Sequence, residues 1–564
     1  MTNLAHVVWL SYHAGILGRG YWDQGTLEEL LARLGYPPHR LTLVHHDTIG
    51  DVPEGEGAIV VIPGRHHAAD IERIASELDA LAWAIVVVTG DEESTFDWLS
   101  LRGEHRRMWI MHPDAADRAE QPQGVTFLGS GAPPRFTAEL RAMDGPPERD
   151  LPLFLAGQAT TDRRREAMAA AAEIEGAEVI ATAGFTQGVD SATYARGMAR
   201  ARIAPCPSGP VAPDSFRLFE ALEAGALPIA DARVTRDEDL HDYWPGIFGE
   251  TPPFPFVDQW EQLGEVVDSA AQGWPANANA AAAWWQWRKR TLTRRMAAQL
   301  ESFGVSAPGH KGELPVTFVV VTSPIPSHPS TAIIEETVRS LFIAGKETPA
   351  ELLILIDGVR PEQEHLRDVY ETYVSRLLWL CAHRWRNVTP LRFEEHRHQS
   401  GMMIAALAHI STPLVVFVEH DTPVIGEVPW TALGSEILDG RVDLIRLHHE
   451  ASILKPHRHL MLGPVANCSV PLQATMQWSQ RPHLASTDFY RRIMAAHFSP
   501  DDATMIEDVM HGVVQSFIGV GGRSAWSQYR LAIYAPKGDI KRSTHLDGRG
   551  DEPKYDMLHR GRVS

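Results

Sequence analysis

An alternation of short β-branched runs with amphipathic helical stretches constrains the fold more than any other feature of the sequence. In the first part of the chain the β-branched runs fall at residues 6–10, 41–45, 58–62, 85–89, 108–111 and 125–128, with amphipathic stretches at residues 25–34 and 69–81. Strands that alternate with helices in this way are typical of a parallel sheet covered by helices on both faces. We therefore predict an α/β lobe over residues 1–145.

The same pattern begins again after a proline-rich, charged passage. Apolar runs at residues 153–157, 179–180, 201–204 and 227–230 predict a second Rossmann-like lobe over residues 146–305. A helix at residues 280–303 carries Trp284, Trp285 and Trp287, which we expect to pack against a core rather than to form a binding surface. The small and polar residues 306–314 predict a linker.

A third α/β unit follows the linker, over residues 315–564. Its predicted strands are residues 316–322, 351–356, 391–393, 413–418 and 442–446, and its predicted helices are residues 331–344, 361–385 and 400–408. The chain of 564 residues thus divides into more than one domain, as its length requires.

Charge and composition narrow the possible partners. The 52 basic and 72 acidic residues give a formal net charge of −20, which disfavours a sequence-independent grip on nucleic acid or on an anionic membrane and leaves open a local basic patch. The three cysteines are far apart, no stretch reaches the ~20 apolar residues of a membrane span, and the first residues lack the basic region of a secretory signal. We expect a cytoplasmic protein with no membrane span.

An acidic tripeptide at the end of a buried strand is the most informative chemical signal. The strand at residues 413–418 runs into Glu419, His420 and Asp421. Open α/β sheets bind ligands at the carboxyl ends of their strands. Two carboxylates separated by one residue can both reach a divalent cation whose other positions are filled by phosphate oxygens and water. A plain polar turn after a core strand is the alternative.

Polar residues at the neighbouring strand ends support a nucleotide site. Thr322 follows the first strand of this unit, and Asp357 follows the second, where it could accept from a base or ribose hydroxyl. His398 and Ser400 open the helix before the acidic strand, and a helix N-terminus favours anions. Further along, Glu507 and Asp508 lie together at the start of a predicted helix.

Residues 315–545 in this order resemble the GT-A glycosyltransferases. The resemblance implies a Mn²⁺ or Mg²⁺ ion held by Glu419 and Asp421, with His545 completing the metal shell and Lys541 neutralising the departing diphosphate. It also implies that Asp508, beside Glu507, is the general base of an inverting transfer. Glu419 in the first acidic place and His420 between the acids depart from the usual family motif.

The segment at residues 205–230 resembles the donor-site segment of exostosin-like GT-B glycosyltransferases. The resemblance implies that the diphosphate meets Ser215 and Arg217, and that a helix-borne acid, Glu220 or Glu223, binds the ribose. Arg163, after the first strand of the second lobe, is similar to the family's arginine that faces the diphosphate. In the first lobe, His13 and Asp23 are candidates for contact with the acceptor.

A GT-B pair of lobes followed by a GT-A domain repeats the architecture of the exostosin family. The resemblance implies a bifunctional glycosyltransferase that uses nucleotide-diphosphate sugars, UDP-sugars above all, and an acceptor hydroxyl on a glycan, glycoconjugate, protein or modified nucleobase. Three alternatives stay open: one module is active and the other is a scaffold, the protein binds or assembles carbohydrate without turnover, or it modifies DNA.

Overall fold

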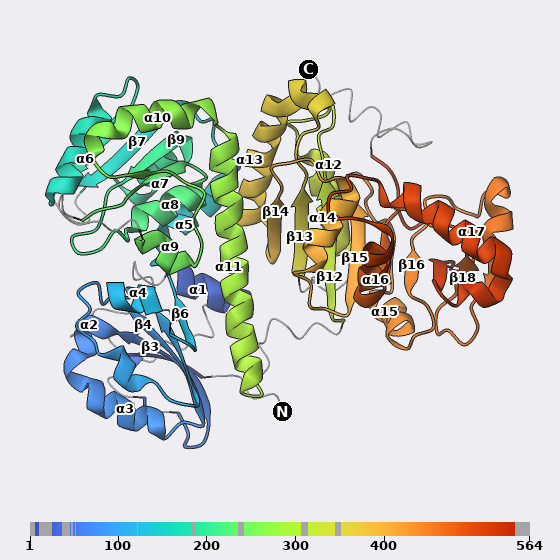
Figure 1. Ribbon diagram of the computed structural model, residues 1–564, viewed down its shortest axis with the longest axis horizontal. Helices are drawn as coiled ribbons and strands as arrows, with labels where there is room; N and C mark the ends of the chain where they lie inside the picture. The colour runs from blue at the N-terminus through green and yellow to red at the C-terminus, as the bar shows by residue number, and fades with distance from the viewer. Residues whose placement is uncertain are drawn as a thin grey trace. The chain divides into compact units, whose positions relative to one another are not determined.

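The computed structural model describes residues 6–10, 25–36, 45–46, 49–50, 52–120, 122–182, 188–234, 242–305, 314–344 and 351–546. The chain forms two compact units, Met1–His310 with Leu378–Arg384, and Lys311–Leu377 with Trp385–Ser564 (Figure 1). Both units are mixed α/β structures built on parallel strands, as the sequence predicts. The predicted linker, residues 306–314, lies outside the described residues except for Leu314.

The first sheet is parallel throughout. Its strands are β1 (His6–Leu10), β2 (His45–His46), β3 (Gly57–Pro63), β4 (Trp83–Thr89), β5 (Arg106–Ile110) and β6 (Val125–Phe127), in the order β2-β1-β3-β4-β5-β6. Every residue of β3 and β4 is buried, which is why these strands read as continuous apolar runs. Alternate residues serve different cores, because Ile59 and Val61 belong to one cluster and Val60 and Ile62 to another.

Five helices accompany this sheet in the described ranges: α1 (Gly25–Arg33), α2 (Gly64–His67), α3 (Ile71–Asp79), α4 (Ala115–Glu120) and α5 (Pro134–Ala142). The two predicted helices correspond to α1 and to α3, which begins two residues later than expected because residues 68–70 form a short 3-10 turn. The strand predicted at residues 41–45 falls almost entirely outside the described residues.

The second sheet is also parallel and follows in the same unit. Its strands are β7 (Leu151–Gln158), β8 (Glu178–Thr182), β9 (Ala201–Cys206), β10 (Leu227–Asp231) and β11 (Phe256–Val257), in the order β11-β10-β9-β7-β8. Its helices are α6 (Asp162–Ala172), α7 (Ser191–Arg200), α8 (Phe216–Ala224), α9 (Tyr243–Phe248) and α10 (Leu263–Gln272). The carboxyl ends of β7, β9 and β10 therefore meet at one edge.

Helix α11 (Ala276–Ser302) packs against both lobes of this unit. In its first half the Trp285 ring lies 5.2 Å from the Phe219 ring of α8, centroid to centroid. In its second half Met296 and Leu300 belong to the core that contains Trp109 of β5. The prediction that the tryptophan-bearing helix packs its apolar face into a core is confirmed for Trp285, which is 1% exposed.

The second unit contains a nine-stranded mixed sheet. Its strands are β12 (Val316–Thr322), β13 (Glu351–Ile356), β14 (Val388–Arg392), β15 (Leu414–Glu419), β16 (Leu444–Arg446), β17 (Met461–Pro464), β18 (Leu472–Thr475), β19 (His483–Ser486) and β20 (Leu531–Tyr534). The order is β14-β13-β12-β15-β19-β16-β20-β18-β17. The first four strands are parallel, and β19 pairs antiparallel with both β15 and β16.

The helices of this unit are α12 (Ala332–Ala344), α13 (Arg367–His383), α14 (His398–Leu407), α15 (Trp430–Leu438), α16 (Thr487–His497) and α17 (Ile506–Trp526). Helix α14 precedes β15, and α17 begins with the predicted acidic pair. Among the helices that the structure describes, none is both long and apolar enough to span a bilayer.

Candidate functional site

Glu419 and Asp421 lie at the carboxyl end of β15, the last of the parallel strands. Between them, His420 is only 6% exposed and lies close enough to the buried His328 to lower its pKa. Glu419 is the last residue of β15, and a turn closed by the Thr422 N–H, which donates to the Glu419 carbonyl at 3.1 Å, brings Asp421 close enough to raise the pKa of Glu419. The structure also brings Glu507 of α17 near Glu419, and we call Glu419, Asp421 and Glu507 the carboxylate cluster.

The carboxylate cluster concentrates negative charge in a buried place. Burial and the charges of Asp421 and Glu507 together raise the pKa of Glu419 to about 8, against the opposing effects of His545 and Gln399. A buried pair of like charges is stabilised when a cation neutralises it.

No group of three or more His, Cys, Asp or Glu side chains within the described ranges is arranged to hold a metal ion. A Mg²⁺-type ion, however, needs only one or two protein carboxylates when phosphates and water fill its other positions. Glu419 and Asp421 fit that donor set.

The C-terminal segment supplies a histidine to this edge. His545 Nε2 lies 3.8 Å from Asp421 Oδ2, and the backbone N–H of Leu546 donates to the Asp421 carbonyl at 2.8 Å. His449, which sequence reasoning did not assign to the site, lies beside His545, with 6.3 Å between the two ring centroids. A 2.6 Å hydrogen bond joins His449 Nδ1 and Ser543 Oγ. The predicted proximity of His545 to the acidic motif is thus present.

Gln399 and Ser400 hold the pieces of the site together. Gln399 Nε2 donates to Glu419 Oε1 at 2.6 Å, and Gln399 Oε1 accepts from the backbone N–H of Ile506 at 3.4 Å. Ser400 is 0% exposed, and its hydroxyl donates to the Asp502 carbonyl and accepts from the Thr504 N–H. The Ser400 hydroxyl therefore fixes the loop before α17, where the sequence suggested a phosphate contact.

Asp357 is similarly engaged by the protein. Its carboxylate is 2% exposed and accepts from the backbone N–H groups of Arg397 and His398 at 2.7 and 3.1 Å, with His396 Nδ1 at 2.8 Å. His398 is held with a positive φ of 51° at the start of α14. Asp357 thus organises the turn into α14, and a ribose hydroxyl would have to share this carboxylate.

The remaining predicted residues of this unit occupy distinct surroundings. Thr322 is 1% exposed and its hydroxyl hydrogen-bonds with that of Tyr373 at 2.8 Å. Asp508 is exposed on the first turn of α17, where its charge opposes the lowering of the His398 pKa by burial. Lys541 forms an isolated β-bridge with His448, close to the end of β16.

A buried arginine near the carboxylate cluster carries no motif in the sequence. Arg446, the last residue of β16, is 2% exposed, and its Nε and Nη1 have no hydrogen-bond partner. Burial and the charge of Arg481 together lower its pKa to about 9, against the opposing effects of Glu507 and Glu450. A lone arginine at a strand end gives no spacing that sequence reasoning could use.

In the first unit, unsatisfied donors gather where α8 begins. Helix α8 starts after the extended Ser215 and ends at Gly225, which has the left-handed φ of 72° that glycine tolerates. Four buried polar atoms here have no hydrogen-bond partner: Gln158 Nε2, Ser208 Oγ, Ser215 Oγ and Arg217 Nε. Buried polar groups are normally paired, so this set indicates a place where a ligand supplies the acceptors.

Two arginines make this place cationic. Arg217 Nη2 donates to the Ala156 carbonyl at 2.8 Å, and Arg164 Nε donates to the Ser208 carbonyl at 3.1 Å. Burial and the charge of Arg217 together lower the pKa of Arg164 to about 10, because the two guanidinium groups repel each other. We call Gln158, Arg164, Ser208, Ser215 and Arg217 the anion site. Sequence reasoning predicted diphosphate contacts for Ser215 and Arg217, and it took Arg163 rather than the neighbouring Arg164 as the arginine that faces the diphosphate.

Three other predicted donor-site residues have protein partners. Arg163 is 1% exposed and forms an ion pair with the fully buried Asp231. Glu220 accepts from the Tyr194 hydroxyl at 2.6 Å. Glu223 accepts from Trp285 Nε1 and from Lys289 Nζ, both at 2.6 Å. These contacts occupy the groups that the sequence suggested for phosphate and ribose. The acceptor candidates His13 and Asp23 lie outside the described residues.

Comparison with known proteins adds distant structural similarities. No family model matches the sequence, and no curated protein is significantly similar to it. The mannosyltransferase PcManGT from Pyrobaculum calidifontis, solved with GDP-Man and Mn²⁺, is 15% identical with a TM-score of 0.29, over 51% of this chain and 72% of its own. GalNAc-T7, solved with UDP, GalNAc and Mn²⁺, is 13% identical with a TM-score of 0.27, over 42% and 44% of the two chains.

Glucosyl-3-phosphoglycerate synthase from Mycobacterium tuberculosis, solved with Mn²⁺, UDP-glucose and phosphoglyceric acid, is a third similar structure. It is 14% identical with a TM-score of 0.25, over 47% of this chain and 83% of its own.

Proposed function

We propose that this chain is a glycosyltransferase that uses nucleotide-diphosphate sugars and carries one donor site in each of its two units. The carboxylate cluster is the observation that carries the proposal. Glu419 and Asp421 lie together at the end of a parallel strand, where burial and mutual repulsion raise the pKa of Glu419 to about 8. A divalent cation and a diphosphate together would neutralise such a pair.

In the second unit, Glu419 and Asp421 would hold Mn²⁺ or Mg²⁺, with His545 approaching from the C-terminal segment. The cation would neutralise the diphosphate as it leaves the sugar. Glu507 is oriented by the backbone N–H of Gln480, which donates to its Oε2 at 2.7 Å. Asp508, exposed one residue further, would take the proton of the acceptor hydroxyl as that oxygen attacks the anomeric carbon, which inverts the centre.

In the first unit, the anion site would hold the diphosphate of a second donor without a metal ion. Arg217 and Arg164 supply charge, and Ser208, Ser215 and Gln158 supply uncharged donors. Phosphate oxygens accept from such donors at the start of a helix. An exostosin-like GT-B module followed by a GT-A module has this arrangement, with UDP-sugars as donors and a glycan or glycoconjugate hydroxyl as acceptor.

A thermal-shift panel tests the proposal. UDP-, GDP-, CDP- and dTDP-sugars are added to the full chain with and without Mn²⁺, because a ligand of the native state raises the melting temperature. We expect a Mn²⁺-dependent shift that Asp421→Ala removes, and a Mn²⁺-independent shift that Arg217→Ala removes. Arg165→Ala, on the exposed arginine that pairs with Asp162, is the control. The absence of any nucleotide-dependent shift would refute the proposal.

A single active site is the second candidate function. The engagement of Arg163, Glu220 and Glu223 within the first unit favours it, since these groups would have to exchange protein partners for ligand. The first unit would then position the acceptor. Product formation separates the two cases: Asp421→Ala and Arg217→Ala each abolish one product in a bifunctional enzyme, whereas only one of them matters in the single-site case.

A further inference from the structure

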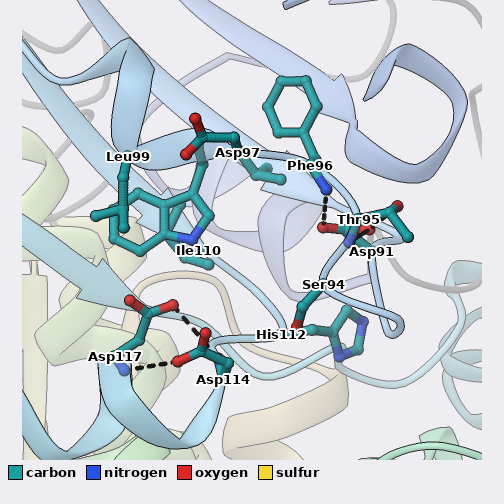
Figure 2. A pocket seen from close by; sticks show the side chains of 12 residues that line it. Asp91, Ser94, Thr95, Phe96, Asp97, Leu99, Ile110, His112, Asp114 and Asp117 are labelled. Carbon is teal, nitrogen blue, oxygen red and sulfur yellow. Dashed lines mark hydrogen bonds between the residues drawn. The ribbon is translucent and has the colours of Figure 1, made fainter. Parts of the chain in front are cut away.

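A polar pocket lies at the carboxyl ends of β4 and β5 in the first unit (Figure 2). Its volume is about 230 Å³, below the range of about 300–1,000 Å³ typical of drug-sized ligands. The lining residues are Val88, Asp91, Ser94, Thr95, Phe96, Asp97, Trp98, Leu99, Ile110, His112, Asp114 and Asp117. None of them belongs to the anion site or to the carboxylate cluster.

The charge of the lining excludes anions. Four aspartates contribute, and the described residues that line the pocket include no lysine or arginine. Burial lowers the pKa of His112 to about 4 despite the charge of Asp91, so this imidazole is neutral near pH 7. Burial and the charge of Asp114 raise the pKa of Asp117. A phosphate or carboxylate group would meet only like charge here.

His112 is the unsatisfied group in the pocket. The residue is 8% exposed, and its Nδ1 is buried without a hydrogen-bond partner. A buried polar atom left unpaired costs about 1–3 kcal/mol. By contrast, Asp91 is fully engaged, because it accepts from the backbone N–H groups of Thr95 and Phe96, both at 2.9 Å, and from the Thr95 hydroxyl at 2.7 Å. The hydrogen bonds of Asp91 therefore hold the loop in place without a ligand. The unpaired Nδ1 of His112 is the atom to which a ligand would hydrogen-bond.

The pocket is amphipathic. Val88, Phe96, Trp98 and Ile110 are buried and give it an apolar lining, while Asp97 and Asp114 are exposed at its rim. Figure 2 shows Asp97 apart from the neighbouring carboxylates of Asp114 and Asp117, which hydrogen-bond each other's backbone N–H groups. A sugar ring has matching features, since its C–H faces are apolar and its hydroxyl groups donate to carboxylates and to an imidazole nitrogen.

The loop that lines the pocket also carries a residue whose charge interacts with the anion site. Glu92 follows Asp91 in the same loop, and the charge of Arg164 opposes the effect of burial, which raises the Glu92 pKa. The loop that lines the pocket therefore continues to Glu92, which interacts with Arg164, a residue that would face a donor diphosphate. We propose that this pocket binds a sugar ring of the acceptor that carries no phosphate or carboxylate. Its assignment to the acceptor rests on the proposed function of the first unit, whereas sugar binding does not.

Direct binding without nucleotide tests the proposal on the full chain. The probes are methyl glucoside, methyl galactoside, methyl mannoside, N-acetylglucosamine and glucosamine, compared with glucuronic acid and glucose 6-phosphate, by saturation-transfer NMR and titration calorimetry. We expect at least one uncharged or amino sugar to bind, and the two anionic sugars to bind about tenfold more weakly or not at all. Absence of binding by every uncharged and amino sugar, or equal binding of the anionic sugars, would overturn the proposal.

Variants locate the binding. His112→Ala should weaken it about tenfold, the effect of one lost hydrogen bond to a buried group. Because His112 is buried, the exposed Asp97 offers a second test: Asp97→Lys should raise the affinity for glucose 6-phosphate at least about tenfold. His105→Ala, on an exposed histidine before β5, is the control and should bind like the unaltered protein. If neither His112→Ala nor Asp97→Lys changes binding, the sugar lies elsewhere and the proposal fails.

The nucleotide-sugar thermal shift, measured on the same samples, separates two kinds of failure. A nucleotide shift without sugar binding refutes this inference alone. Sugar binding without a nucleotide shift refutes the proposed transferase function and leaves the pocket a sugar site.

Discussion

Gln399 donates its side-chain N–H to Glu419 at 2.6 Å, while the carbonyl oxygen of the same amide accepts from the backbone of Ile506. One side chain of α14 therefore joins the acidic end of β15 to the start of the helix that carries Glu507 and Asp508. The hydrogen bond to Glu419 lowers the pKa of that carboxyl against burial and the charge of Asp421, and so favours the form that binds a cation.

Gln399→Met tests this link. Methionine keeps the length of the side chain and removes both hydrogen bonds, so Glu419 holds its proton more tightly and binds metal less well. We expect Mn²⁺ affinity, measured by the metal-dependent thermal shift, to fall about tenfold near pH 7. Gln528→Met, on an exposed glutamine after α17, is the control. An unchanged Mn²⁺ titration in Gln399→Met would show that the amide does not tune the site.

Arg163 and Arg217 should behave differently when each is replaced by alanine. Arg163→Ala leaves Asp231 buried without its ion-pair partner, a change that typically costs about 3–5 kcal/mol of unfolding free energy. Arg217→Ala removes a single backbone hydrogen bond and should cost far less, but should abolish the Mn²⁺-independent nucleotide shift. Urea unfolding and the nucleotide panel measure the two effects. Equal loss of stability in both variants would contradict the separate roles.

The buried Asp214 should make stability fall as pH rises. Burial raises its pKa from 3.8 to about 7, and hydrogen bonds from Ser130 only partly oppose this. The folded chain therefore holds this proton more tightly than the unfolded chain, so unfolding free energy is lost between about pH 4 and pH 7, by at most about 4 kcal/mol. Asp214→Asn should remove this loss.

The measurement compares the change in melting temperature between about pH 4.5 and pH 8 in the unaltered chain and in Asp214→Asn. The difference between the two chains isolates Asp214 from other titrating groups. Asp268→Asn, on an exposed aspartate of α10, should follow the unaltered chain. A pH profile that is identical in all three proteins would exclude the assigned protonation of Asp214.

Lys289 of α11 should contribute strongly to the stability of the first unit. It is 1% exposed, and its ammonium group lies 3.0 Å from Glu29 Oε2 of α1 and 2.6 Å from Glu223 Oε1 of α8. Lys289→Met leaves the buried Glu223 without its cation, while Glu29 keeps its ion pair with Arg33, and should cost about 3–5 kcal/mol in unfolding free energy. Adding Glu223→Gln should restore part of that loss, as a double-mutant cycle measures. A Lys289→Met chain as stable as the original would show that the pairs contribute nothing.

The sequence predicted the parallel strands well because their signal is local. The buried strands β12 and β13 coincide with the predicted runs, since every residue from Val316 to Thr322 is buried and apolar or β-branched. The insertion of β19 between β15 and β16 was not predictable in this way. Strand order depends on pairing between distant segments, and β19 follows β16 by more than thirty residues of chain.

The same distinction applies to the site. The proximity of Glu419 and Asp421 is local, because only one residue separates them in the turn that ends β15. The engagement of Arg163 and Glu223 does not, because their partners Asp231 and Lys289 lie 68 and 66 residues away in the chain. Arg446 belongs to no motif, and although Gln399 and Ser208 lie in segments that the sequence singles out, only the fold shows what their side chains face.

Helix α11 connects the two lobes of the first unit. Its aromatic half packs on α8, and its other half belongs to the core that contains Trp109 of β5, so the helix contacts the cores of both sheets. Lys289 adds ion pairs to Glu29 of α1 and Glu223 of α8. A movement of one lobe of this unit relative to the other would therefore have to bend α11 or break its contacts with one of the two cores.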